Sequence, residues 1–307
     1  MGNENYITIL QKILKKTGWN QARLAQEIGV TFLSVNRWLN GHSQPHKTNL
    51  RTINRLYNTY VGIEPVSSQE LEKLFQKVDQ QQDYYGEIGK YLTKPEIVDA
   101  YLLELTYHSD AIEGSTLSKK ETEAIIFDKA TIRDKDLVEH LEAVNHSVIL
   151  KDIFTRPVRT IEESWVLEIH RRLMQGIRQD GGQYAITQRA IRGVDLQLPH
   201  PDDIPEEMAG YFSRVNKQSG NGICYIAEMH AVFEAIHPFG DGNGRVGRLI
   251  MIAQLLAKGY APCVIVKENR ADYYEALEWA QKGETTHLQK FVIEAVLEGY
   301  KILAKLP

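Results

Sequence analysis

Cysteine is scarce in this chain of 307 residues, because only Cys224 and Cys263 occur. Two cysteines exclude a disulfide framework and a four-thiolate zinc site, and we expect both to be reduced thiols in the core. Long apolar runs are also absent, since no stretch approaches the ~18 uninterrupted apolar residues that a membrane span needs. The first residues lack the basic-then-apolar order of a signal peptide. The sequence therefore predicts a soluble, cytoplasmic protein with no membrane partner.

The composition is that of an ordinary globular protein, with 43 % hydrophobic and 25 % charged residues. It excludes a disordered, collagen-like or coiled-coil chain. Charge, however, is distributed unevenly. Residues 1–62 hold four lysines and four arginines against two glutamates, a balance of +6, so the other residues carry −10 of the total of −4. At roughly 150 residues per domain we expect two domains, and a compact basic domain typically binds a polyanion.

Residues 20–41 show two short helical periods separated by a glycine. Asn20 is placed to cap the first helix, which ends at Gly29, where a residue that tolerates positive φ is needed. The second helix follows Thr31 as its N-cap and stops at Asn40. Two short helices joined by such a turn make a helix-turn-helix, although a helical hairpin that binds nothing shows the same pattern.

This segment resembles helix-turn-helix domains of the phage-repressor type, which open the first helix with Gln-Ala, turn at Gly-Val and close the second helix with Asn-Gly. The resemblance implies that Thr31, Ser34 and Arg37 face the major groove of duplex DNA. Phe32 and Leu33 stand where this family usually carries polar side chains that contact bases. They could contact thymine methyl groups or dock on the rest of the protein.

Helical periodicity dominates from residue 95 onward. Between residues 182 and 201, glycine and proline break this pattern, and apolar residues there predict a short β-hairpin. We expect three parts, namely a helix-turn-helix domain (1–62), a linker with a connecting helix (63–90) and a larger domain (91–307). The helices expected in the larger domain cover about 96–108, 119–128, 134–154, 162–175, 203–217, 222–236, 243–258, 269–282 and 286–304.

Residues 237–248 read His-Pro-Phe-Gly-Asp-Gly-Asn-Gly-Arg-Val-Gly-Arg. They predict a glycine-rich loop followed by a helix, so that backbone N–H groups and the positive helix end converge above Asn243 and Gly244. Arg245 and Arg248 lie on one face at the start of that helix. Two guanidinium groups oppose the helix dipole there, which makes sense if a polyphosphate is bound between them.

Two further side chains of the loop suit chemistry on a polyphosphate. Asp241 offers an oxygen ligand to Mg2+, and His237 can accept a proton from an attacking hydroxyl. A dinucleotide-binding turn is a competing interpretation, because Gly242, Gly244 and Gly247 satisfy the G-x-G-x-x-G pattern. The preceding residues have helical periodicity, and no alternation of strands and helices follows, which argues against it. A purely structural glycine-rich connection is the remaining alternative.

Residues 237–248 match the motif of the Fic family, His-Pro-Phe-x-Asp-Gly-Asn-Gly-Arg-x-x-Arg, at every defined position. The chain resembles this family from about residue 95 to 305. The resemblance implies an all-α fold, with a helical core and a short β-hairpin flap, that transfers AMP from ATP to a hydroxyl side chain of a protein. It also implies roles for the loop residues: His237 as general base, Asp241 as Mg2+ ligand, Gly242, Asn243 and Gly244 as the cradle of the α- and β-phosphates, Arg245 on the β-phosphate and Arg248 on the γ-phosphate.

Residues 109–114, Ser-Asp-Ala-Ile-Glu-Gly, are similar to the inhibitory motif of the same family, which begins here with Ser109. By themselves they would be an ordinary helix end. In the family the glutamate, here Glu113, pairs with the second arginine of the loop motif, here Arg248. The resemblance implies that Glu113 removes the clamp for the γ-phosphate, so that ATP lies with its α-phosphate misplaced for attack.

Two further segments resemble the nucleotide site of the family. Tyr273 and Tyr274 look like its adenine-side helix, although Gln281 stands where relatives often have Asn. Tyrosines that only pack a helix face would give the same pattern. Residues 190–198 look like the flap, whose edge pairs with an extended target segment, and Ile191 is the residue expected to contact adenine.

The sequence thus predicts a protein adenylyltransferase that uses ATP and Mg2+ and is autoinhibited by Glu113. Its target is a serine, threonine or tyrosine hydroxyl of another protein or of itself. One alternative is removal of AMP from a modified target at the same site, with Glu113 orienting a water. Another is a DNA-binding transcriptional regulator whose Fic core senses nucleotide. A homodimer is compatible with the sequence.

Overall fold

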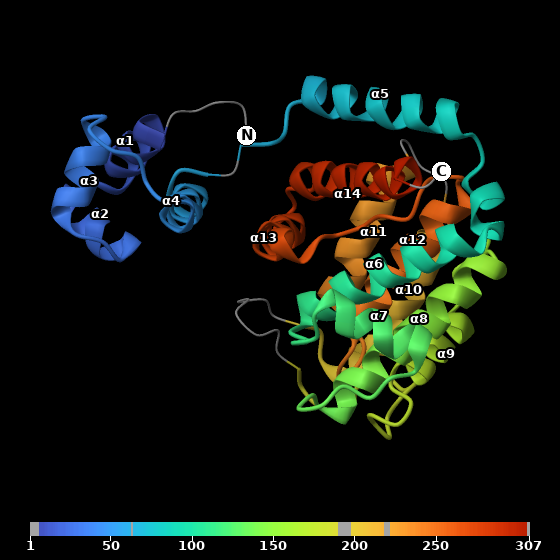
Figure 1. Ribbon diagram of the computed structural model, residues 1–307. Helices are drawn as coiled ribbons and strands as arrows, with labels where there is room; N and C mark the ends of the chain where they lie inside the picture. The colour runs from blue at the N-terminus through green and yellow to red at the C-terminus, as the bar shows by residue number, and fades with distance from the viewer. Residues whose placement is uncertain (1–5, 63, 190–197, 218–221, 306–307) are drawn as a thin grey trace. The chain divides into compact units, whose positions relative to one another are not determined.

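The computed structural model describes residues 6–62, 64–189, 198–217 and 222–305, and the chain divides into two compact units, Met1–Val66 and Ser67–Pro307 (Figure 1). The connecting helix α5 (Ser68–Tyr85) belongs to the larger unit, because it packs against α14 (Thr286–Ala304). This division differs from the expected linker, which includes the same helix. Within the described ranges, every helix is too short or too polar to cross a lipid bilayer.

The described part of the smaller unit consists of four helices. Asn20 caps α2, because its side chain accepts a hydrogen bond from the N–H of Arg23 at 2.8 Å, and Gly29 ends this helix with a φ of 80°. Thr31 caps α3 through a hydrogen bond from the N–H of Ser34 at 3.3 Å. The predicted helix-turn-helix is therefore confirmed at both helix starts and at the turn. The helix bounds are α1 (Tyr6–Thr17), α2 (Gln21–Ile28), α3 (Phe32–Leu39) and α4 (Lys47–Tyr60).

A single apolar core holds these four helices together. Each helix contributes an amphipathic face, and burial of such faces is the main source of stability for short helices. The core side chains include Leu10 and Ile13 of α1, Leu24 and Ala25 of α2, Val35 and Trp38 of α3, and Ile53 and Leu56 of α4.

All nine helices predicted from residue 95 onward are present in the larger unit. The main difference is α6, which runs five residues further than expected, to Glu113, where Gly114 ends it with a φ of 113°. The inhibitory motif is thus the last turn of a long helix. The bounds are α6 (Pro95–Glu113), α7 (Lys119–Asp128), α8 (Leu137–Thr155), α9 (Glu163–Leu173), α10 (Ile204–Val215), α11 (Gly222–Ile236), α12 (Asn243–Ala257), α13 (Arg270–Gln281) and α14, with short 3-10 turns at Ile88–Thr93, Pro201–Asp203 and Lys267–Asn269.

The predicted β-hairpin flap is not supported by the structure. Residues 182–189 and 198–201 contain no strand, and Ile191, like the rest of 190–197, lies outside the described residues. The described start of this segment is hydrogen-bonded to the loop of residues 237–242 and not to a partner strand. The N–H of Ala185 donates to the carbonyl of Pro238 at 2.9 Å. The all-α class is otherwise confirmed for the described chain.

Helix α11 is central to the larger unit, where it packs against α10, α12, α13 and α14 (Figure 1). Helix α6 packs against α7, α8, α12 and α14. The loop motif begins at the end of α11 and continues into α12, and the inhibitory motif ends α6. Because α12 packs against both α6 and α11, the two motifs meet at the N-terminus of α12.

Candidate functional site

The loop of residues 237–242 joins α11 to α12 and is closed by one of the residues that follow it. The side chain of Asn243 accepts a hydrogen bond from the N–H of Phe239 and donates one to its carbonyl, both at 2.8 Å. Gly242 has a φ of 75°, and a Cβ there would lie 2.5 Å from Cε of Met174. Since the Asn243 amide is used within the loop, only its backbone N–H is left to contact an anion.

His237 lies at the junction of α11 and the loop. Its φ of 50° is in the left-handed region, which is uncommon for a residue other than glycine. Its side chain is 19 % exposed, and Nδ1 lies 4.0 Å from Oε2 of Glu234. Burial lowers the pKa of His237 to about 4, and the guanidinium of Arg189 acts in the same direction. The imidazole is therefore neutral at neutral pH and can accept a proton.

Arg248 of α12 is the point where the two motifs meet. Its Nη2 donates to Oε1 of Glu113 at 2.8 Å and to the carbonyl of Ser109 at 3.1 Å, and its Nε donates to Oγ of Ser109 at 3.0 Å. Burial disfavours the charged guanidinium, but Glu113 outweighs it and raises the pKa of Arg248. The inhibitory motif thus holds Arg248 as a buried cation.

The carboxylate of Glu113 lies against the N-terminus of α12. A Cβ at Gly244, the second residue of this helix, would be only 2.3 Å from Oε1 of Glu113, so the close approach requires glycine. Burial opposes ionisation of Glu113, but Arg248 and then Arg245 outweigh it, and the pKa of Glu113 is lowered. A charged carboxylate therefore occupies the place where a helix N-terminus accepts an anion.

Arg245 is buried and paired with an acid that the sequence did not indicate. Its Nη1 lies 2.5 Å from Oε1 of Glu142 on α8, and its Nη2 lies 3.8 Å from Oδ1 of Asp241. Asp110 of the inhibitory motif is also buried, and neither of its carboxyl oxygens has a hydrogen-bond partner among the described residues. Burial raises the pKa of Asp110 to about 7. The sequence carries no signal that connects Glu142 with Arg245, because the contact joins two distant helices.

Glu234 is another buried acid that the sequence analysis missed. It lies one helical turn before His237, and burial raises the pKa of its carboxyl to about 8. A Cβ at Gly247 would lie 2.6 Å from Oε1 of Glu234, which shows how closely α11 and α12 approach. The spacing of three residues from His237 is the signal that could have found it.

Asp241 is the residue that could hold Mg2+. Its side chain is 51 % exposed, and Oδ1 accepts a hydrogen bond from the N–H of Gly242 at 2.6 Å. Mg2+ is commonly bound through one or two carboxylates together with substrate phosphates. The carboxylate of Asp241 is accessible and lies beside the N-terminus of α12, where the carboxylate of Glu113 is already placed. This arrangement fits a Mg2+ ion that is bound together with phosphates. Among the described residues there is no cluster of three acids, histidines or cysteines that would bind a metal without a substrate.

The two tyrosines of α13 lie in different environments. Tyr273 is completely buried, and its hydroxyl forms a 2.6 Å hydrogen bond with Nε2 of His230. Tyr274 is half-buried, and the guanidinium of Arg270 lies over its ring, 5.3 Å from the centroid. Burial raises the pKa of Tyr274, and the charge of Glu113 acts in the same direction. Tyr274 is therefore the more accessible of the two.

The residues expected to face DNA lie on the surface of the smaller unit. Thr31 and Arg37 are exposed and Ser34 is half-buried, with its hydroxyl 2.9 Å from that of Thr31. Phe32 and Leu33 are 52 % and 62 % exposed, although both are large apolar side chains. All five belong to α3 or its N-cap, with Arg37 in the last turn of the helix and the other four at its start.

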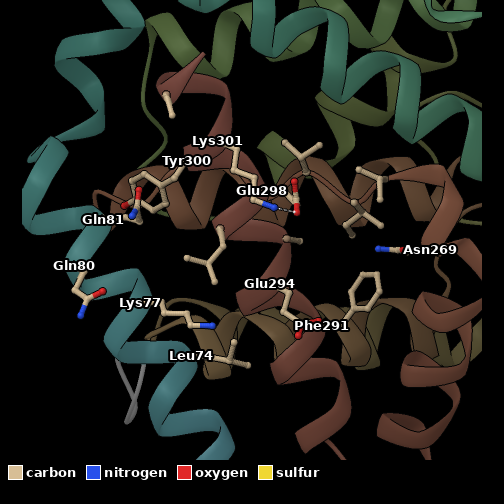
Figure 2. A pocket seen from close by; sticks show the side chains of 16 residues that line it. Leu74, Lys77, Gln80, Gln81, Asn269, Phe291, Glu294, Glu298, Tyr300 and Lys301 are labelled. Carbon is tan, nitrogen blue, oxygen red and sulfur yellow. Dashed lines mark hydrogen bonds and ion pairs between the residues drawn. The ribbon is translucent and has the colours of Figure 1, made fainter. Parts of the chain in front are cut away.

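A cavity of about 540 Å3 lies between α5, α14 and the segment 264–269, and Figure 2 shows its mixed lining. Lys77 and Glu294 point into it, and Lys301 is paired with Glu298 in its lining. Phe291 supplies part of the apolar wall. None of its lining residues belongs to the loop motif or the inhibitory motif, so this cavity is separate from the candidate site.

Two family models match the chain. The model described as the Fic/DOC family matches residues 160–255, which include the loop and α12. The model described as helix-turn-helix matches residues 10–62.

Two curated proteins of similar sequence carry the same name. Protein adenylyltransferase Fic of Nematostella vectensis is 30 % identical over 271 residues, which cover 80 % of this chain and 63 % of that protein. Protein adenylyltransferase Fic of Aedes aegypti is 30 % identical over 234 residues, which cover 73 % of this chain and 46 % of that protein. The chain thus spans less than two thirds of the length of these relatives.

Solved structures share the fold. A fragment of Fic-1 from C. elegans superposes with a TM-score of 0.69 at 20 % identity, covering 99 % of this chain and 94 % of that one. A Fic family protein from Desulfovibrio desulfuricans gives a TM-score of 0.68 at 22 % identity, covering 79 % of this chain and 77 % of that one. With the family matches, these likenesses lead to one assignment: the chain carries a Fic/DOC family domain, preceded by a helix-turn-helix domain.

Proposed function

We propose that this protein transfers AMP from ATP to a hydroxyl side chain of a target protein or of itself, and that Glu113 restrains the transfer. The observation that carries the proposal is the position of the Glu113 carboxylate, which lies on the N-terminus of α12 and is bound by Arg248. An oxyanion of the chain itself thus occupies a site suited to a phosphate. The name of the curated relatives supports the same reaction class.

The phosphates of ATP would be held by the start of α12. The first N–H groups of a helix have no partner within it, and those of Gly242, Asn243 and Gly244 are expected to face the α- and β-phosphates. The N–H of Gly242 would first have to release the carboxylate of Asp241. Arg245 would contact the β-phosphate and Arg248 the γ-phosphate, each through charge-assisted hydrogen bonds. Both contacts require the arginines to exchange their present acidic partners for phosphate oxygens.

His237 is suited to act as the general base. The target hydroxyl oxygen forms a bond to the α-phosphorus, the bond from that phosphorus to the bridging oxygen breaks, and pyrophosphate leaves. The hydroxyl proton passes to the neutral imidazole of His237. Mg2+, held by Asp241 and the phosphates, would offset the negative charge that builds up on the leaving group.

Glu113 restrains this reaction by occupying the place of the γ-phosphate. While Arg248 is bound to Glu113 and Ser109, it is unavailable to the nucleotide, and the carboxylate repels a phosphate at Gly244. ATP without this clamp would lie with its α-phosphorus displaced from His237. A displacement of ~1 Å in a reacting centre can lower a rate about 100-fold.

Adenine would be bound on the side of α13. Tyr274 is the accessible member of the tyrosine pair and suits stacking or edge contact with a base, whereas the buried Tyr273 would support it from below. Ile191 is also proposed to contact adenine.

Transfer of label from nucleotide to protein tests the proposal. The wild type, Glu113→Gly and the double variant Glu113→Gly, His237→Ala are incubated with Mg2+ and with α-labelled or γ-labelled ATP. We expect Glu113→Gly to label itself or lysate proteins from the α position, and the double variant to show none. Transfer from the γ position, or no transfer from either, would refute adenylylation.

Removal of AMP is the competing activity of the same site. Glu113 would then orient a water molecule, so Glu113→Gly would lose the removal of AMP from a modified target. An unchanged rate of adenylylation in Glu113→Gly, together with lost removal, would favour this reaction over restrained transfer.

We also propose that the smaller unit binds duplex DNA. The exposed side chains of Thr31 and Arg37 lie at α3, and the balance of +6 over residues 1–62 suits a polyanion. The exposure of Phe32 and Leu33 is compatible with contacts to thymine methyl groups.

A further inference from the structure

His170 of α9 belongs to neither motif, yet it contacts the loop of residues 237–242 directly. It is 1 % exposed. Its Nε2 lies 3.2 Å from the carbonyl oxygen of Asp241, and its Nδ1 lies 2.9 Å from the backbone nitrogen of Gly182. The imidazole therefore bridges the loop and the segment that follows α9.

These two contacts determine where the ring hydrogen lies. The backbone N–H of Gly182 can only donate, so Nδ1 of His170 accepts. The ring hydrogen is then on Nε2, which donates to the carbonyl of Asp241. Gly182 can reach the ring because its φ is +80° and because a Cβ there would lie 2.9 Å from Cβ of Arg171. No larger residue could bring this N–H so close to α9.

A third contact supports the loop from the same side. The ring of His170 stacks on the ring of Phe239, with the centroids 3.7 Å apart and the planes inclined by 17°. The backbone of Phe239 is in turn closed by the amide of Asn243. His170 thus holds the loop at two residues, Phe239 by stacking and Asp241 by a hydrogen bond.

We propose that His170 is a positioning residue, which fixes the backbone of Asp241 and thereby directs the Asp241 carboxylate towards the metal and the phosphates. This inference rests on the proposed function, in which Asp241 holds Mg2+. The Asp241 side chain is half exposed and accepts a hydrogen bond from the N–H of Gly242, so its direction follows from the backbone of the loop. Residues that orient a metal ligand typically change metal affinity or activity by about 10–100-fold when they are replaced.

Three substitutions of His170 separate its contacts. His170→Gln can keep a donor near Nε2 for the Asp241 carbonyl, and His170→Asn can keep an acceptor near Nδ1 for Gly182. His170→Phe keeps the ring and its stacking on Phe239 but loses both hydrogen bonds. If the proposal is correct, His170→Gln behaves like the parent protein. The Asn and Phe variants both lose the hydrogen bond to the carbonyl of Asp241 and should show the same defect.

The first measurement is the dependence of adenylylation on Mg2+ concentration, with Glu113→Gly as the parent protein. We expect His170→Phe and His170→Asn to raise the Mg2+ concentration for half-maximal rate about 10-fold or more, with a smaller change at saturating Mg2+. An equal loss of maximal rate in all three variants at unchanged Mg2+ dependence would mean that His170 only packs the core, and would overturn the proposal.

The second measurement needs no enzymatic activity. Hydrogen exchange of the peptide that contains residues 237–242 is followed by mass spectrometry in the otherwise wild-type chain, with thermal unfolding as a check of the fold. We expect faster exchange in the Phe and Asn variants than in the Gln variant. Unchanged exchange in His170→Phe would overturn the proposal. If the Glu113→Gly parent is inactive, adenylylation is contradicted. The role of His170 is still tested, because hydrogen exchange measures how firmly it holds the loop without any need for activity.

Discussion

Arg248 of α12 and Glu113 of α6 form an ion pair of 2.8 Å between helices that are far apart in the sequence. The side chain of Arg248 is 5 % exposed, so a partner is required to stabilise its charge. The same carboxylate lies beside Gly244, at the N-terminus of α12. One contact therefore supplies the counter-charge of the buried guanidinium and places a carboxylate at the N-terminus of α12.

Replacing Glu113 by Gly should release Arg248 for the nucleotide. Charge-assisted hydrogen bonds of this kind contribute ~1.5 to 3 kcal/mol, and each 1.36 kcal/mol corresponds to a factor of ten in rate, so we expect adenylylation to rise about 10 to 100-fold. The rate of α-label incorporation measures it. Adding Arg248→Ala should cancel the gain, and a gain that survives in that double variant would contradict the role of Arg248.

Replacing His237 by Ala should abolish transfer and leave ATP binding intact. The imidazole is expected to contact the attacking hydroxyl, whereas the phosphates are expected to be held by the start of α12. Label transfer and equilibrium binding of ATP are measured in the Glu113→Gly background. Turnover within tenfold of the parent would exclude His237 as the general base.

The acid stability of the fold should reflect its buried histidines. Burial lowers the pKa of four histidines in the larger unit, to about 3 for His146 and His230 and to about 4 for His170 and His237. Below the unfolded pKa of about 6.5, the unfolded chain binds these protons and the folded chain does not. Each histidine therefore lowers the free energy of unfolding by about 1 kcal/mol per pH unit as the pH falls from 6.5 to 5.

The raised pKa values of Asp110 and Glu234 act in the opposite direction over the same range, since the folded chain keeps protons that the unfolded chain loses. The effect of four histidines exceeds that of two acids. We therefore expect the free energy of unfolding to fall by about 2 to 3 kcal/mol for each pH unit below 6.5. Urea unfolding at pH 7.5, 6.5 and 5.5 measures it. His146→Gln should make the dependence less steep, and a stability that does not fall below pH 6.5 would contradict these assignments.

DNA binding by the full chain should be sensitive to salt and should depend on Arg37. Arg37→Ala, at α3, is expected to reduce the preference for one DNA sequence over another. Lys47→Ala, at the start of α4, is expected to lower the affinity for all DNA sequences alike. Electrophoretic mobility shifts at ~50 mM and ~200 mM salt, with random-sequence competitor, measure both effects. Absence of binding at ~50 mM salt would contradict DNA binding and favour a docking role for α3.

The local structure of this chain follows from local sequence signals. The N-caps Asn20 and Thr31 and the helix ends at Gly29 and Gly114 depend on the conformational and hydrogen-bonding properties of single residues. Helical periodicity sufficed to find the helices of the larger unit. The β-hairpin is not supported in the described part of its range, and residues 190–197, which hold most of the apolar residues behind that prediction, lie outside the described residues.

The environment of each charge was decided by tertiary structure alone. The sequence predicted that Arg245 and Arg248 share one face at the start of the helix. Packing of α6 and α8 against the site buries both and supplies Glu142 and Glu113 as partners. The same packing buries the carboxyl of Asp110 without a hydrogen-bond partner among the described residues. A single sequence carries no record of which distant helix provides the counter-charge, since that contact exists only when the helices pack and water is excluded from between them.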